Sequence, residues 1–184
     1  MVSDLRRSIG ALVGLFLTAC ALHASAQTQA SAAELEAAYL YRFLSFVEWP
    51  AERFDAPAAP IVVAVAGAPE LAAELRAAVL DRAAQNRPIM VRVLAPGEPP
   101  GEPHVLFVGR EAASRLAELA RDAMRATLLV SDVPDALARG AMIGFVESDS
   151  RLRFAVALDT AQRAGLRINS RMLAVALYVR GGRQ

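Results

Sequence analysis

The sequence predicts an α/β fold: a single compact domain in which a mixed, mostly parallel sheet of about five to six strands is flanked by helices. Short apolar runs rich in β-branched residues, typical of buried strands, alternate with amphipathic helical segments. A polar turn near the carboxyl end separates two further strand-like runs. Strands separated by helices favour a parallel sheet, whereas two strands joined by a tight turn add an antiparallel part. The length of 184 residues suits one domain.

The first 26 residues, 1–26, have the pattern of a secretory signal peptide. Arg6 and Arg7 form a basic start, and residues 9–22 are apolar and uncharged. Ala24-Ser25-Ala26 then matches the small-x-small pattern that signal peptidase recognises. The apolar run is shorter than the roughly 20 residues of a membrane span. We therefore expect an exported, periplasmic protein.

A second interpretation of the leader stays open. Residues 17–20 resemble a lipobox, in which a leader of residues 1–19 is removed and Cys20 is lipidated. The mature protein would then be anchored to a membrane by its lipid. In either case residues 27–32 form a tether, and the folded domain is expected over residues 33–180.

A helix is the first element expected in this domain. Ser31 followed by Glu34 fits a capping box, in which each side chain satisfies an amide group at the helix start. Apolar residues recur near helical spacing from Leu35 to Val47. Pro50 stops the helix, because the residue before a proline avoids the α region.

Strands and helices then alternate. The strands are apolar and rich in Val, Ile and Leu, and the helices carry apolar residues on one face. A Pro- and Gly-rich loop occupies residues 95–103. The strands are expected at residues 61–66, 88–94, 104–108 and 127–131, and the helices at residues 70–80 and 111–123.

The last part of the chain predicts a hairpin and short helices. Polar residues 148–150 are typical of a tight turn between two strands. Gly165 closes one short helix, and Asn169 caps a final helix that runs to about Tyr178. The expected elements are a helical turn at 132–138, strands at 141–147 and 151–158, and a helix at 159–164.

Composition and charge exclude several function classes. The formal net charge is +1, and removal of the leader leaves the domain close to neutral, which argues against nucleic acid as a partner. Cys20 is the single cysteine and leaves with the leader or becomes lipidated. Thiol redox chemistry, disulfides and cysteine-based zinc sites are therefore excluded in the domain.

No motif for catalysis or for a cofactor is found. The sequence lacks the nucleophile elbow, the phosphate-binding loops and the zinc-protease motif. His104 is expected to be a structural residue at the start of a strand. Glu34, Glu36, Glu48 and Glu52 on the first helix and just after it are expected to cap the helix or to face water. We predict no enzyme, no catalytic or metal-binding residues and no cofactor.

A ligand pocket is a weaker expectation. Asp132 and Asp135 directly follow a strand, where α/β folds often place ligands, although helix capping would also explain Asp132. Ser131, Asp132 and Arg167 are the candidate residues of a pocket for an anionic or aromatic ligand.

Aromatic residues are concentrated on the first helix. Five of them lie within 11 positions, and helical spacing places Tyr39, Phe43 and Phe46 on one face, as in a core. Tyr41 falls on another face. Tyr, Trp and Arg dominate binding hot spots, so Tyr41, Arg42 and Trp49 are the candidate residues for binding a protein partner.

With these segments placed, the chain resembles the YfiR family of periplasmic proteins over about residues 33–180. The most specific block holds a Tyr-x-Tyr and a Val-Glu-Trp-Pro motif. The order and spacing of the other blocks agree with it. The matching blocks are residues 37–50, 104–108, 128–132 with 140–145, and 151–154 with 164–170.

This resemblance implies a compact α/β fold, secretion and no enzymatic activity. It also implies a role: the better-understood relatives restrain an inner-membrane diguanylate cyclase by binding its periplasmic sensor part, which lowers cyclic di-GMP and limits biofilm growth. Two departures matter here. Pro103 stands where some relatives have a cysteine, so their disulfide control cannot operate, and Arg42 stands where Asn is common.

Three functions are therefore compared. The leading expectation is a regulator that binds the periplasmic domain of an inner-membrane signalling protein. The alternative is a periplasmic module that binds a small ligand. An enzyme is the third, and it would need a nucleophile and base that the sequence does not show. The apolar surface would also allow a homodimer.

Overall fold

The computed structural model describes residues 31–122 and 125–181. The described chain belongs to one compact unit that begins at Ser31. The predicted signal peptide, residues 1–26, and the alternative lipidation site at Cys20 lie outside the described residues.

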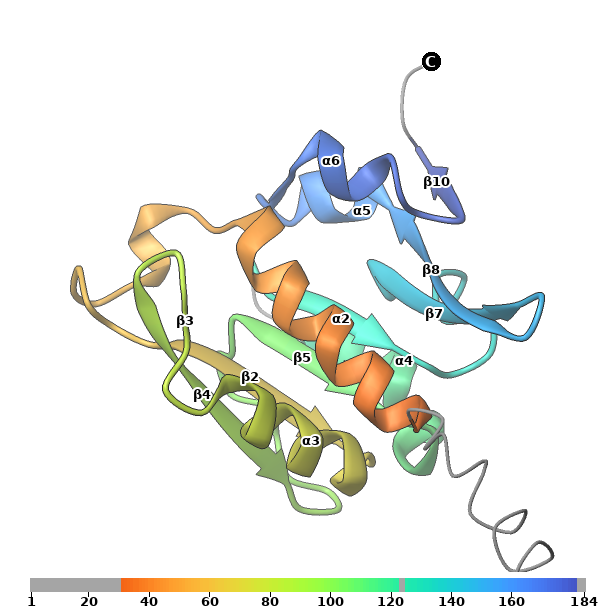
Figure 1. Ribbon diagram of the computed structural model, residues 1–184, viewed down its shortest axis with the longest axis horizontal. Coiled ribbons are helices and arrows are strands. Elements are labelled where there is room, and N and C mark those ends of the chain that lie inside the picture. Colours follow the sequence, from red (N-terminus) through yellow and green to blue (C-terminus); the bar gives the residue numbers. More distant parts are fainter. Residues whose placement is uncertain (1–30, 123–124, 182–184) are drawn as a thin grey trace, which may run out of the picture. The chain divides into compact units, whose positions relative to one another are not determined.

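The main sheet has eight strands, against the five to six expected, and it curls into a half-barrel (Figure 1). Its mixed, mostly parallel character is confirmed, since the four central strands are parallel and the late hairpin is antiparallel. A small second sheet pairs β1 (Val47–Glu48) with β9 (Arg167–Ile168). In spatial order the main strands are β10 (Tyr178–Arg180), β8 (Arg151–Ala157), β7 (Ile143–Ser148), β6 (Leu128–Ser131), β5 (Val105–Val108), β2 (Ile61–Ala66), β4 (Arg87–Leu94) and β3 (Ala83–Ala84).

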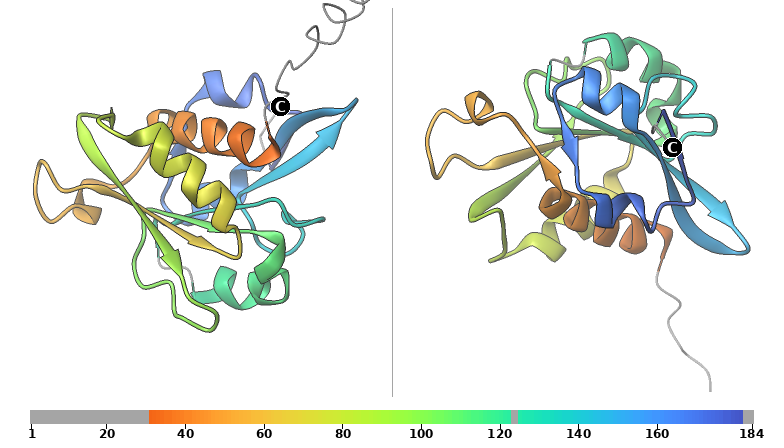
Figure 2. Two further views of the ribbon diagram at one scale, coloured as in Figure 1. Left: turned by 60° about the horizontal axis from the view of Figure 1, so that its bottom comes forward. Right: turned by 90° about the horizontal axis from the view of Figure 1, so that it is seen from above.

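Helices cover both faces of the sheet (Figure 2). The first two, α2 (Ala32–Phe46) and α3 (Pro69–Val79), pack together on one face, and α4 (Leu116–Asp122) lies on the other. In the part of the chain that the structure describes, no helix combines the length and the apolar character needed to cross a membrane. The remaining helices are the 3₁₀ helices η2 (Ala51–Arg53) and η3 (Arg110–Arg115), α5 (Leu158–Arg163) and α6 (Ser170–Leu173).

Strands β2 and β5, in the middle of the sheet, are apolar throughout because both of their faces are covered. Along β5, Val105 and Phe107 contribute to the core beneath α2 and α3, whereas Leu106 and Val108 contribute to the core beneath α4. Alternate side chains of a strand point to opposite faces, so a continuous apolar run serves a sheet covered on both sides.

Aromatic rings fix α2 against the sheet. Phe43 is 2% exposed, and its ring meets Phe154 of β8 edge to face, with 5.0 Å between the ring centroids. Tyr39 meets Phe154 edge to face as well, and its ring is tilted against that of Phe145. Such pairs add to the free energy gained from burying the rings. The predicted core face of this helix is therefore confirmed.

Three expected helices differ in the structure. The first ends at Phe46 rather than at Pro50, because Val47–Glu48 pairs with β9. The last is a four-residue helix, α6, and the chain then adds β10 to β8 instead of continuing as a helix. The helix expected at residues 111–123 is divided into the 3₁₀ helix η3 and the α-helix α4. In the first two cases, pairing with a distant strand overrides the local pattern.

Candidate functional site

A groove of about 330 Å³ opens where three parallel strands end. Gly67 follows β2, Arg110 follows β5 after one residue, and Asp132 directly follows β6. The first turns of α2 and α3 line the other side. Because α/β sheets commonly place ligands at the carboxyl ends of their strands, this groove is the candidate functional site.

Two glycines let the loops of the groove approach each other closely. Gly67 has a φ of +63°, a conformation that side chains rarely adopt, and a Cβ there would overlap the backbone of Ala112. A Cβ on Gly109 would overlap the carbonyl oxygen of Gly67. The Gly109 amide also donates a hydrogen bond of 2.8 Å to Ala66. These contacts hold Arg110 in place beside the groove.

Glu36 is a buried charged residue in the wall of the groove. It lies on the inner face of α2, one turn before Leu40, and it is only 7% exposed. Among the residues described, no hydrogen bond to its carboxyl group is found. The pKa of Glu36 is raised to about 7, mainly because the carboxyl group is buried; the nearby Asp132 carboxylate adds to the rise and Arg110 opposes it.

Asp132 is the second carboxyl group of the groove, and Arg110 is its ion-pair partner. Its Oδ2 lies 3.3 Å from the Nε of Arg110, whose side chain is 74% exposed. Its Oδ1 is buried and has no hydrogen-bond partner in the described part of the chain. Burial raises the pKa of Asp132, and Arg110 works against the rise. A partner this exposed contributes little net free energy.

This arrangement suits ion binding better than covalent chemistry. No hydroxyl-bearing side chain is among the described residues that line the groove, and the neighbouring Ser131 is fully buried. It donates a 2.7 Å hydrogen bond to the Val108 carbonyl and accepts one of 3.1 Å from the Val133 amide. Ser131 therefore holds the end of β6 in place, and it is not a wall residue of the groove.

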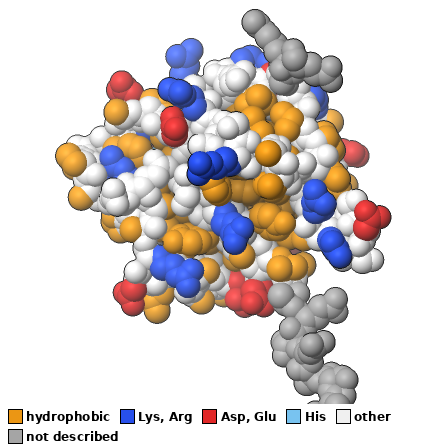
Figure 3. All heavy atoms as spheres, turned by 45° about the horizontal axis from the view of Figure 1, so that its top comes forward, with side chains coloured by type: hydrophobic (Ala, Val, Ile, Leu, Met, Phe, Trp, Pro, Cys, Tyr) orange, Lys and Arg blue, Asp and Glu red, His pale blue; other side chains and the backbone are white. Residues whose placement is uncertain are grey.

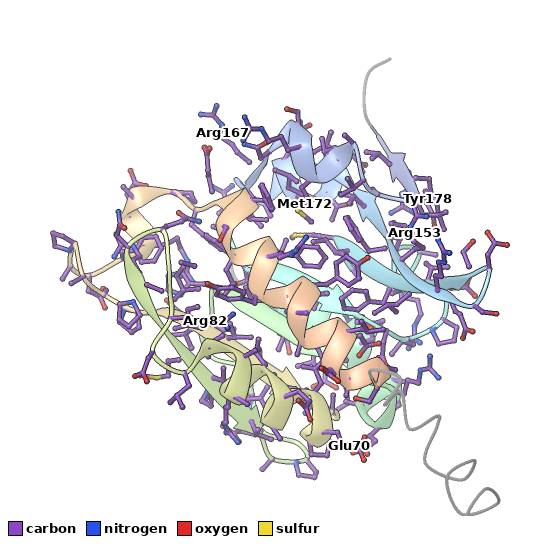
Figure 4. All side chains as sticks on the ribbon, viewed as in Figure 1. Glu70, Arg82, Arg153, Arg167, Met172 and Tyr178 are labelled. Atoms are coloured by element: carbon purple, nitrogen blue, oxygen red, sulfur yellow. The ribbon has the colours of Figure 1, made fainter. Side chains whose placement is uncertain are left out.

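The three residues expected to form a pocket do not come together. Arg167 lies on β9, where its side chain is 86% exposed and pairs with Glu48 at 3.6 Å. Glu48 follows the carboxyl end of α2, whereas the groove lies at the amino end. Figure 4 shows Arg167 at the opposite end of α2 from Glu70, which lines the groove. Of the three, only Asp132 belongs to the site.

His104 is structural, as the sequence predicts. It is 6% exposed, its Nδ1 accepts a 3.1 Å hydrogen bond from the Val62 amide, and its Nε2 donates to the Arg53 carbonyl at 3.2 Å. Its ring stacks on Phe54, with 4.5 Å between centroids. Burial lowers the pKa of His104, and Arg53 lowers it further. The neutral ring thus ties β2, β5 and the η2 segment together.

The residues expected to bind a partner have different environments. Trp49 is 8% exposed, and its indole donates a 3.0 Å hydrogen bond to the His104 carbonyl, so its ring belongs to the core. Tyr41 is half-buried, and its hydroxyl donates to the Ala83 carbonyl at 3.4 Å while Arg82 lies 5.5 Å from its ring centroid. Arg42 is exposed on the outer face of α2. Arg42 is thus the most accessible of the three.

Sequence reasoning assigned Glu36 to water or capping, and it did not select Arg110. The helical spacing of Glu36, Leu40 and Phe43 places Glu36 on the apolar face of α2. The burial of Glu36 could therefore have been predicted from the sequence. Nothing in the sequence around Arg110 indicates its role, because that role depends on Asp132 in the loop that follows β6.

Comparisons with known proteins agree with the fold. The model of the YfiR/HmsC-like family matches residues 33–177. The crystal structure of a conserved domain protein from Vibrio cholerae O1 biovar El Tor str. N16961 is similar at 13% identity and a TM-score of 0.57. The alignment covers 82% of this chain but 60% of that one, and at this identity it concerns the fold alone. Among curated proteins, no match was found.

Proposed function

The chain belongs to the YfiR/HmsC-like family, and on that premise we propose that its domain is a non-enzymatic periplasmic regulator. It binds and restrains a membrane-bound signalling protein, namely a diguanylate cyclase with a periplasmic sensor part. The observation that carries this proposal is the family match, which extends over nearly the whole described domain. Export by the signal peptide of residues 1–26 would bring the domain to that partner.

The outer face of α2 supports the proposal as a docking surface. Its exposed residues Leu35, Ala38, Arg42 and Ser45 follow one another at helical spacing. Leu35 is 40% exposed and is one of the large apolar side chains on the surface of the described domain. Figure 3 shows a face of the molecule on which apolar side chains surround separate arginines. Apolar contacts with an arginine anchor are typical of protein interfaces.

Arg42 is a better test residue than Tyr41. Tyr41 packs against the core and bonds to Ala83, so Tyr41→Asp would disturb folding as well as binding. Arg42→Glu reverses one exposed charge and leaves the core intact. Arg121→Glu is the matched control, because Arg121 is exposed on α4, on the other face of the sheet, and contacts only its own helix at Ala117 among the described residues.

The test is a measurement of cyclic di-GMP in the organism that produces the protein. Deletion of the gene is expected to raise cyclic di-GMP, and re-expression of the natural chain or of the Arg121→Glu variant to lower it again. Arg42→Glu is expected to reach the same periplasmic level without restoring restraint. An unchanged level of cyclic di-GMP after deletion would refute the regulatory role. If the Arg42→Glu variant lowered cyclic di-GMP as far as the natural chain does, the outer face of α2 would be excluded as the docking surface.

A further inference from the structure

We propose that the groove at the amino end of α2 binds a small organic cation, whose ammonium group lies between Glu36 and Asp132. This inference goes beyond the regulatory role, because the groove is separate from the exposed face that carries Arg42. It rests on three observations: the charge balance of the groove, its buried acceptors without donors, and its size.

Acidic groups outnumber basic groups around the groove. Glu36 of α2, Glu70 of α3, Glu111 of η3 and Asp132 after β6 all line it, and Arg110 is the one basic residue among them. Arg110 already pairs with Asp132. Arg110 acts on both Glu36 and Asp132 and is one positive charge against four carboxyl groups, so the lining is acidic on balance and its potential favours a cation from solution.

Two carboxyl groups at the groove have no hydrogen-bond donor for an oxygen among the described residues, and of these oxygens the Oδ1 of Asp132 is fully buried. The Glu36 carboxyl has no hydrogen bond in the described part of the structure, and the Oδ1 of Asp132 is buried without one. Buried polar atoms are nearly always paired, and leaving one unpaired is costly. An ammonium group carries three donors and no acceptor. It can therefore donate to both carboxyl groups and neutralise their charge at once, whereas a neutral amide supplies donors without the charge and an anion is repelled.

The groove suits an organic cation better than a metal ion. Over the described residues, no cluster of three or more potential metal ligands is found. A volume of about 330 Å³ is at the lower end for a small-molecule site. Ala32, Ala33 and Leu71 supply apolar walls that would contact the hydrocarbon part of an alkylammonium.

The raised pKa of Glu36 should make the affinity for a cation depend on pH in the neutral range. A cation binds the ionised carboxylate, so the affinity rises with pH through the pKa of about 7. Asp132, Glu70 and Glu111 oppose this ionisation, and Arg110 favours it. Between pH 8 and pH 6 the ionised fraction of a group with this pKa falls about tenfold, and we expect the affinity to fall by about the same factor.

The test is calorimetric titration of the exported protein, purified from the periplasm, in amine-free phosphate buffer. The probes are butylammonium and 1,4-diaminobutane, with butyramide as the neutral analogue and butyrate as the anionic one. We expect the two cations to bind with saturation, and about tenfold more weakly at pH 6 than at pH 8. Absence of saturation up to 10 mM, or tighter binding of butyramide, butyrate or Mg²⁺, would overturn the proposal.

Three variants locate the site. Glu36→Gln is expected to weaken binding at pH 8 by about tenfold or more and to abolish its dependence on pH. The matched control Glu34→Gln removes an equal charge from the exposed side of the same helix and should leave binding unchanged. Arg110→Gln should strengthen cation binding, because it frees Asp132. If Arg110→Gln weakens binding of these cations instead, the Asp132 carboxylate does not hold the ammonium group and the proposal is wrong.

Discussion

The substitution Glu36→Gln tests whether a buried carboxyl group destabilises this domain as the pH rises. The pKa of Glu36 is about 7 in the folded protein against an ordinary value of 4.5. Between these values the folded state binds more protons than the unfolded state. The free energy of unfolding therefore falls as the pH rises from 4.5 to 7, and it changes no further above that range on account of this residue.

The size of the effect follows from the two pKa values. Each pKa unit is worth about 1.4 kcal/mol, which sets a ceiling of about 3.5 kcal/mol on the stability lost over the rise from 4.5 to about 7. The carboxyl group lines an open groove, so water screens part of its charge and we expect a loss of about 1–3 kcal/mol. Glutamine has nearly the same shape and no charge. The free energy of unfolding of the Glu36→Gln variant should therefore not fall in this way as the pH rises.

Urea unfolding of both proteins at pH 4.5 and pH 8 measures the effect. The stability of the variant relative to the natural protein should increase by about 1–3 kcal/mol between these pH values. His104 also titrates, but it is present in both proteins and its effect cancels in the difference. Glu34→Gln is the control and should show no such increase. An unchanged difference, or one of opposite sign, would show that the Glu36 carboxyl is not desolvated.

Two further predictions concern packing, and urea unfolding checks both. Phe43→Ala should lower the free energy of unfolding by about 3–5 kcal/mol, because its ring is buried against Phe154, whereas Ser45→Ala on the exposed side should change it by less than about 0.5 kcal/mol. Gly109→Ala should lower it by about 1–3 kcal/mol, because the new Cβ meets the Gly67 backbone; an unaltered stability would show that the two loops separate easily.

The sequence was a good guide where local pattern and tertiary structure agree. Strands β2 and β5 are apolar throughout and β6 is apolar up to Ser131, because both faces of these strands are covered, and these short apolar runs identified them in the sequence. It was a poor guide to strands of two or three residues, such as β1 and β10. These strands form only because they pair with strands far away in the sequence. Residues 169–178 have helical spacing, so the local sequence does not indicate that β10 begins at Tyr178.

The same difference between local pattern and tertiary contacts explains which residues of the candidate site could be predicted. Asp132 was expected near a ligand because a carboxylate directly after a buried strand stands at a known position of α/β folds. Arg167 was grouped with it on residue type, but β9 pairs with β1 and carries Arg167 to the far end of α2. Glu36 joins Asp132 because α2 crosses the sheet with its amino end over the loops after β5 and β6. A site built from segments nearly 100 residues apart depends on the direction in which a helix crosses a sheet. That direction follows from the packing of Phe43 and Tyr39 on β7 and β8, which no local pattern records.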